Sequence, residues 1–109
     1  MGDQFKTPCA LPTEGEREAL TLLIEECAEV QQRATKMLRF GRDEIQPGQP
    51  LDNSERLSRE IGDLSVVIDL VIKMRLCDQI SISIGAGNKF NQLEKYLQSE
   101  DARTALTRR

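Results

Sequence analysis

The sequence contains no histidine among its 109 residues. This absence removes imidazole general acid/base catalysis, Ser-His-Asp and Cys-His nucleophile pairs, and the commonest zinc ligand. Aromatic residues make up only 4% of the chain, whereas charged residues make up 30%. A chain whose apolar content is mainly Leu, Ile and Val favours amphipathic helices over a sheet. Enzymatic chemistry here must therefore use carboxylates, lysine, arginine, hydroxyl groups or a metal ion held by oxygen.

Cysteine pairs, excess basic charge and long apolar runs are also missing. The three cysteines show no CxxC spacing and no even pairing, which favours reduced thiols in the cytoplasm. A formal net charge of -3 provides no global field for nucleic acid. The N-terminus lacks the pattern of a signal peptide, and the longest apolar stretch, Leu64 to Ile72, is too short to span a bilayer. We therefore expect a cytoplasmic protein with no nucleic-acid or membrane partner.

Composition divides the chain into an arm, a helical domain and a tail. Residues 1–12 contain two prolines and show no periodicity, so they are predicted to form an N-terminal arm. Residues 13–98 hold the periodic segments, and a chain of this length has room for one modest core. Residues 99–109 are predicted to form a polar, solvated C-terminal tail that frays.

The first helix is predicted from its caps and its spacing. Thr13 followed by Glu16 has the pattern of a capping box, and Gly41 is a plausible end. Residues 41–51, rich in Pro and Gly, are predicted to form a loop. The apolar stripe is expected to comprise Leu20, Leu23, Ile24, Cys27, Gln31, Ala34 and Leu38.

The second helix is apolar on almost every side. It is predicted to start at Asp52 with Glu55, or at Asn53 with Arg56. A helix this apolar must be buried on several sides, and one short chain offers too few partners. We therefore expect burial in a multi-chain helical bundle. The main stripe is expected to comprise Leu57, Ile61, Leu64, Ile68 and Val71.

The third segment carries conflicting signals. Residues 80–84 alternate Ile and Ser as a strand would, and Gly85 and Gly87 weaken a helix. Asp78 is a candidate cap, and helical spacing returns after Phe90. Because a single strand would have no partner in the chain, we predict a helix here and an all-α fold.

Two pairs of acidic residues are the strongest candidates for chemistry. They are Glu26 with Glu29 on the first helix, and Glu60 with Asp63 on the second. An i,i+3 spacing places both members of a pair on one helix face. Four carboxylates in one cleft repel each other, and a hard divalent cation such as Mg²⁺ or Mn²⁺ relieves the repulsion. Because such pairs also occur by chance on acidic helices, spacing alone leaves a solvated face as an equal alternative.

Basic and aromatic residues near these acids suggest how a nucleotide could be held. Arg33 and Lys36 continue the acidic stripe and could reach phosphates, although solvent pairing with Glu29 would explain them equally well. Phe40 ends the helix beside the loop and could stack on a base. Asn91 could hydrogen-bond a base edge.

Three runs in this order resemble the MazG-like all-α nucleoside triphosphate pyrophosphohydrolases, especially short single-domain and phage-type members. The runs are residues 25–30 (EECAEV), 36–41 (KMLRFG) and 60–64 (EIGDL), and the resemblance covers roughly Leu20 to Leu97. It implies a helical bundle completed by dimerisation or dimer-of-dimers assembly, hence a homodimer or homotetramer. It also implies Mg²⁺-dependent hydrolysis of a (deoxy)nucleoside triphosphate to the monophosphate and pyrophosphate.

The resemblance also implies roles for individual residues. Lys89 is the phosphate ligand that the resemblance implies. The chemistry of phosphoryl transfer also needs a proton acceptor, and we expect Glu29 in that role, with Glu29 and Glu60 as the catalytic residues. A relative specific for dUTP or phosphoribosyl-ATP remains an alternative within the same fold. A helical nucleotide-binding or oligomerisation module without catalysis is the alternative from another class. The expected Mg²⁺ ligands are Glu26, Glu29, Glu60 and Asp63.

Overall fold

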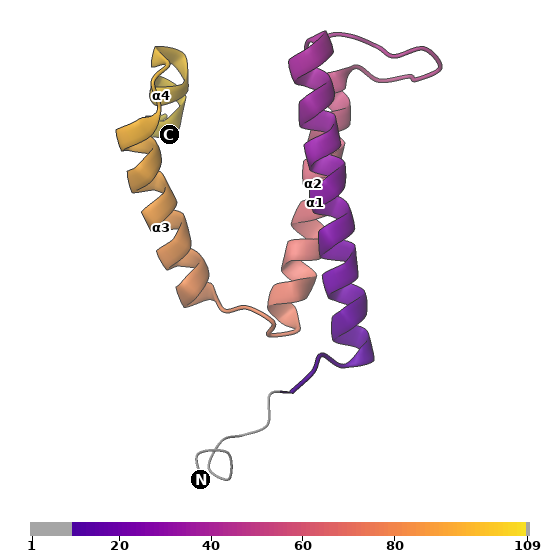
Figure 1. Ribbon diagram of the computed structural model, residues 1–109, viewed down its shortest axis with the longest axis vertical. Helices are drawn as coiled ribbons and strands as arrows, with labels where there is room; N and C mark the ends of the chain where they lie inside the picture. The colour runs from indigo at the N-terminus through magenta and orange to yellow at the C-terminus, as the bar shows by residue number, and fades with distance from the viewer. Residues whose placement is uncertain (1–9, 109) are drawn as a thin grey trace. The chain divides into compact units, whose positions relative to one another are not determined.

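The computed structural model describes residues 10–108, and these residues contain helices and no strand (Figure 1). The all-α prediction is therefore confirmed, including the helix over residues 80–84. The predicted N-terminal arm falls mostly on residues 1–9, outside the described residues. None of the described helices is long and apolar enough to cross a membrane. The helices are α1 (Glu14–Phe40), α2 (Asn53–Lys73), α3 (Gln79–Tyr96) and α4 (Glu100–Thr107).

Side-chain caps fix where α1 and α2 begin. The Thr13 hydroxyl accepts a hydrogen bond from the Glu16 amide at 3.1 Å, and the Glu16 carboxylate accepts one from the Thr13 amide at 2.7 Å. Asp52 and Glu55 form the same reciprocal pair at 2.8 and 3.2 Å. These bonds satisfy amides that no helical carbonyl can reach. The predicted capping boxes are confirmed, and α2 starts with the Asp52 cap.

Glycine ends α1 because the backbone turns there into a region that side chains disfavour. Gly41 has a φ of 87°, and its amide donates to the Met37 carbonyl at 2.9 Å. A loop follows to Asp52, as predicted from its composition. The loop reverses the chain direction, so α1 and α2 form an antiparallel hairpin (Figure 1).

The described residues form two compact units, with the boundary between Leu76 and Cys77. In the first unit, α1 and α2 pack along a seam whose positions alternate by three and four residues. Ala19 and Val71 are its buried apolar residues. The seam of α1 holds Ala19, Leu23, Glu26, Val30, Arg33 and Met37. The seam of α2 holds Asn53, Leu57, Glu60, Leu64, Val67, Val71 and Met74.

The predicted apolar stripes are offset from this seam. Ile24 is 70% exposed and Leu38 is 88% exposed, and Cys27 is exposed as well. On α2, Leu57, Leu64 and Val71 lie on the seam as predicted, but the stripe's two isoleucines, Ile61 and Ile68, are exposed. The seam between α1 and α2 takes up polar residues and leaves part of the predicted stripes uncovered by this chain, whereas the prediction expected other chains to bury them.

In the second unit, α3 runs without interruption through Gly85 and Gly87. Its N-terminus is capped by the Asp78 carboxylate, which accepts a hydrogen bond from the Ser81 amide at 2.8 Å. This bond to the carboxylate lowers the pKa of Asp78 from its ordinary value of 3.8. None of the α3 residues is fully buried.

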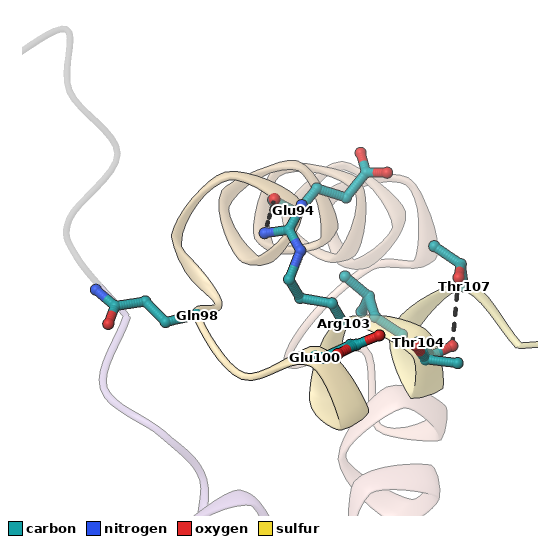
Figure 2. A pocket seen from close by; sticks show the side chains of 7 residues that line it. Glu94, Gln98, Glu100, Arg103, Thr104 and Thr107 are labelled. Atoms are coloured by element: carbon teal, nitrogen blue, oxygen red, sulfur yellow. Dashed lines mark hydrogen bonds between the residues drawn. The ribbon is translucent and has the colours of Figure 1, made fainter.

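The short helix α4 differs from the fraying tail expected after Ser99. Arg103 donates from Nη1 to the Glu94 carbonyl at 2.9 Å (Figure 2) and to the Leu97 carbonyl at 2.8 Å. These carbonyls lie at and just beyond the C-terminal turn of α3, where no helical amide is available. Acidic residues in the first turn of α4 also interact favourably with the helix dipole. The Arg103 hydrogen bonds and the half-buried side chains of Ala102 and Leu106 thus attach this largely polar helix to α3.

Candidate functional site

Three of the four predicted acidic ligands meet where α1 packs against α2. One carboxylate oxygen from each of Glu26, Glu60 and Asp63 lies within 4.8 Å of the others. Glu26 and Glu60 are half-buried seam residues, and Asp63 is exposed one turn further along α2. The antiparallel hairpin therefore brings together acids that are more than thirty residues apart in the sequence. We refer to Glu26, Glu60 and Asp63 as the acidic triad.

Glu29, the fourth predicted ligand, stands beside the triad and not in it. Its side chain is exposed and lines a pocket that Glu60 also lines. Its negative charge still contributes to the raised pKa of Glu60. The structure thus gives Glu29 a position at the solvent side of the acids, where its carboxylate is accessible.

Glu60 lies in an environment that disfavours the charged form of its carboxyl group. Burial is the main cause that raises its pKa above the ordinary value of 4.5, followed by a hydrogen bond with the Glu26 side chain. The charges of Glu29, Asp63 and Glu26 raise the pKa further. The Oε2 atom of Glu60 is also buried, and it has no hydrogen-bond partner among the residues that the structure describes. A buried carboxylate oxygen with no donor is costly and calls for a cation or a proton.

No basic side chain neutralises the triad. Among residues 10–108, the single ion pair joins Lys73 to Asp69 at 2.7 Å, on the solvent side of α2. The triad offers only carboxylate oxygens, which are the ligands that hard divalent cations prefer. With an unpartnered Glu60 oxygen among them, the residues present fit Mg²⁺ or Mn²⁺.

Beside the triad lies a pocket of about 320 Å³ that contains three arginines. Arg33 was predicted as a phosphate ligand, whereas Arg56 and Arg59 were not singled out. Arg56 lies four residues before Glu60 and therefore on the same helix face, a spacing that could have identified it. We call this the arginine pocket, and its lining residues are Glu29, Arg33, Gln49, Pro50, Leu51, Arg56, Arg59 and Glu60.

Two side chains of α2 hold the loop that forms one wall of the arginine pocket. Asn53 is 2% exposed, and its Nδ2 donates to the Gly41 carbonyl at 2.8 Å and to Glu44 Oε1 at 3.3 Å. Arg56 donates from Nη1 to Gln46 Oε1 at 2.8 Å. These bonds tie the first half of the loop, residues 41–46, to the N-terminal turns of α2.

The remaining predicted site residues lie away from the triad or on another unit. Lys36 and Arg39 approach the ring of Phe40, at 5.7 and 5.0 Å from its centroid, which places two cations against the proposed stacking surface. Lys36 and Phe40 do not line the arginine pocket. Lys89 and Asn91 are exposed on α3, in the second unit. Their predicted roles, like those of Lys36 and Phe40, stay predictions.

The second unit also has a pocket, of about 410 Å³, between α3 and α4 (Figure 2). Arg103, which caps α3, is its central charged residue, and no predicted site residue lines it. The Arg103 side chain hydrogen-bonds the end of α3, so we assign it a structural role.

Comparison of the chain with protein-family models, curated proteins and solved structures gives no match. The MazG-like resemblance therefore depends on the sequence runs, and functional inference depends on the geometry of the acidic triad and the arginine pocket.

Proposed function

We propose that this chain is a cytoplasmic, MazG-like pyrophosphohydrolase that hydrolyses a (deoxy)nucleoside triphosphate to the monophosphate and pyrophosphate. One observation carries the proposal: Glu26, Glu60 and Asp63 converge within 4.8 Å on two rigid helices, and a buried Glu60 oxygen has no partner. Phosphoryl-group chemistry depends on positioning and on charge neutralisation, and it needs no histidine or nucleophilic side chain. This requirement agrees with the residue types that the chain has.

The acidic residues have two proposed roles, which are to hold the metal ion and to accept a proton. Glu26, Glu60 and Asp63 would hold Mg²⁺, with Glu29 available at the pocket side. When bound, the ion supplies charge neutralisation and a lowered pKa for a coordinated water. Glu29, exposed and outside the triad, is positioned to accept the proton of the attacking water at its carboxylate. Arg33 would donate to phosphate oxygens, because its Nη1 is buried and has no hydrogen-bond partner within residues 10–108.

The proposed enzyme is a homodimer or a homotetramer. The support is the apolar surface that the hairpin leaves exposed, including Ile24, Leu38 and Ile61. Large apolar side chains gathered on one hairpin are typical of a surface that another chain covers. Burial of this surface would also explain why so few residues of a single chain form a core.

The test is release of pyrophosphate from a panel of canonical and modified (deoxy)nucleoside triphosphates, with Mg²⁺ and with EDTA. The panel includes dUTP and phosphoribosyl-ATP, so that it also identifies the substrate class. The site variant is Glu60→Gln. Glu18→Gln is the matched control, because Glu18 is exposed on α1 and lies outside the triad and the pocket.

Release that requires Mg²⁺, is lost in Glu60→Gln and persists in Glu18→Gln would support the proposal. No release from any nucleotide by the folded wild-type protein would refute it. The chain would then be better described as a non-catalytic helical module.

A further inference from the structure

The arginine pocket contains charges of both signs that do not pair with each other. Arg33, Arg56 and Arg59 line it together with Glu29 and Glu60, yet none of these residues forms an ion pair within residues 10–108. Arg33 Nη1 and Glu60 Oε2 are both buried, and neither has a hydrogen-bond partner in the described part of the chain. Opposite charges in one pocket that remain apart indicate that each sign has a separate ligand to bind.

The three arginines differ in how firmly they are placed. Arg33 lies on the α1 seam and is half-buried, so packing limits its rotamers. Arg56 is held by its bond to Gln46 at 2.8 Å, and this neutral acceptor leaves its charge uncompensated. Arg59 is exposed at the rim, next to Glu60 in the sequence. Two guanidinium groups are therefore preorganised, and the third can adjust to a ligand.

The geometry points to a pyrophosphate subsite in which Arg33, Arg56 and Arg59 bind the two terminal phosphates of the substrate, and free pyrophosphate after cleavage. The inference depends on the proposed function for the identity of the ligand. Guanidinium groups present paired N–H donors that match phosphate oxygens, and three of them suit a highly charged anion. A mononucleotide without these phosphates would leave the arginines unsatisfied.

The neighbouring acids make this subsite dependent on a cation. Bare pyrophosphate would be repelled by Glu29, Glu60 and the rest of the acidic triad, and a bare cation would be repelled by the arginines. A divalent cation on the triad together with pyrophosphate on the arginines satisfies both sets of charges. We therefore expect binding of the two ligands to be cooperative, each raising the affinity of the other by the same factor.

The experiment is titration calorimetry of the full chain with inorganic pyrophosphate, in Mg²⁺ and in EDTA. Wild type is compared with Arg59→Gln, which changes an exposed side chain, and with Arg33→Gln. Arg17→Gln is the control of equal charge, because Arg17 is exposed on α1 outside the pocket. Circular dichroism checks that each variant is folded.

The expected result is pyrophosphate binding in Mg²⁺ that is lost or strongly weakened in EDTA. Each pocket variant should weaken it about tenfold or more, the effect of losing one charge-assisted hydrogen bond, while Arg17→Gln should not. Unchanged binding by folded Arg59→Gln and Arg33→Gln, equal weakening by Arg17→Gln, or no binding by wild type in Mg²⁺ would each overturn the inference.

Turnover separates this inference from the proposed function. If both variants hydrolyse nucleotide and bind pyrophosphate as wild type does, the pyrophosphate subsite is refuted and the proposed function stands. If pyrophosphate binding depends on the arginines but no nucleotide is hydrolysed, the proposed function is refuted and the pyrophosphate-binding site remains.

Discussion

Replacing Glu60 with glutamine should stabilise the protein when no divalent cation is present. Glu60 loses a charge that lies within 4.8 Å of the carboxylates of Glu26 and Asp63. At that separation each repulsion is worth about 1 kcal/mol in a water-like dielectric, which suits a triad with one exposed member. The gain is therefore about 1–2 kcal/mol, and each kcal/mol corresponds to a rise of about 4–8 °C in Tm for a domain of this size.

The pH dependence of this gain has a definite sign. The pKa of Glu60 is raised in the folded state, so the folded protein holds this proton more tightly than the unfolded chain does. The contribution to stability is fully present below the ordinary pKa of 4.5 and is lost as pH rises through the folded value. The difference in Tm between Glu60→Gln and wild type should therefore be small near pH 4 and largest at neutral pH.

Thermal unfolding followed by circular dichroism, at equal protein concentrations, would measure both effects. In EDTA the variant should melt above wild type, with Glu18→Gln as the control for charge alone. In Mg²⁺ the order should reverse, because a cation at about 100 times its Kd stabilises wild type by about 2.7 kcal/mol and the variant by less. A variant that melts at or below wild type in EDTA at pH 7 would refute the view that Glu60 is electrostatically strained.

Three further substitutions test the elements around the site. Asn53→Ala removes the hydrogen bonds of a buried amide and should lower the free energy of unfolding by about 2–3 kcal/mol in chemical denaturation. Hydrogen exchange over residues 42–51 should also become faster, and unchanged slow exchange there would contradict the role given to Asn53. Arg103→Ala should remove exchange protection from α4 and leave α1 and α2 unchanged, whereas a protected α4 would show that other contacts order it. Asp78 has a lowered pKa, so its contribution to the stability of α3 is present above pH 3.8 and lost as pH falls through the folded value. Asp78→Asn should remove this acid-dependent loss of helicity, and an unchanged acid titration by circular dichroism would argue against the cap.

Local chemistry made the helix boundaries predictable from the sequence. The reciprocal bonds of Thr13 with Glu16 and of Asp52 with Glu55 involve residues three apart, so the pattern contains the whole interaction. The positive φ of Gly41 is a similarly local signal. The helix at residues 100–107 was missed although the sequence holds local signals for it, namely Ser99 at the N-cap position and two acids in the first turn. The Arg103 bonds to carbonyls six and nine residues away could not be read from a local pattern.

The seam of the hairpin was harder to predict because its composition is mixed. A stripe chosen by apolarity selects Ile24 and Leu38, which are exposed, and rejects Glu26 and Arg33, which lie on the seam. Chain topology decides the seam, and polar residues there break the hydrophobic pattern. The i,i+3 spacing selected the three acids of the triad, but it also selected Glu29, which lies outside the triad. The hydrogen bond between Arg56 and Gln46 depends on the conformation of the loop, so it could not be predicted from the sequence.

The same polar residues explain both the offset seam and the candidate site. Leucine at positions 26 and 60 would extend the apolar contact between α1 and α2, and it would remove two partly buried carboxylates that repel each other. The chain instead places two facing carboxylates at half-buried seam positions, with Arg33 and Asn53 along the same seam. Rigid helices hold these groups more precisely than loops could, which is what a charged ligand site requires. The acidic seam weakens the isolated hairpin, and ligand binding can recover that stability only in the folded state.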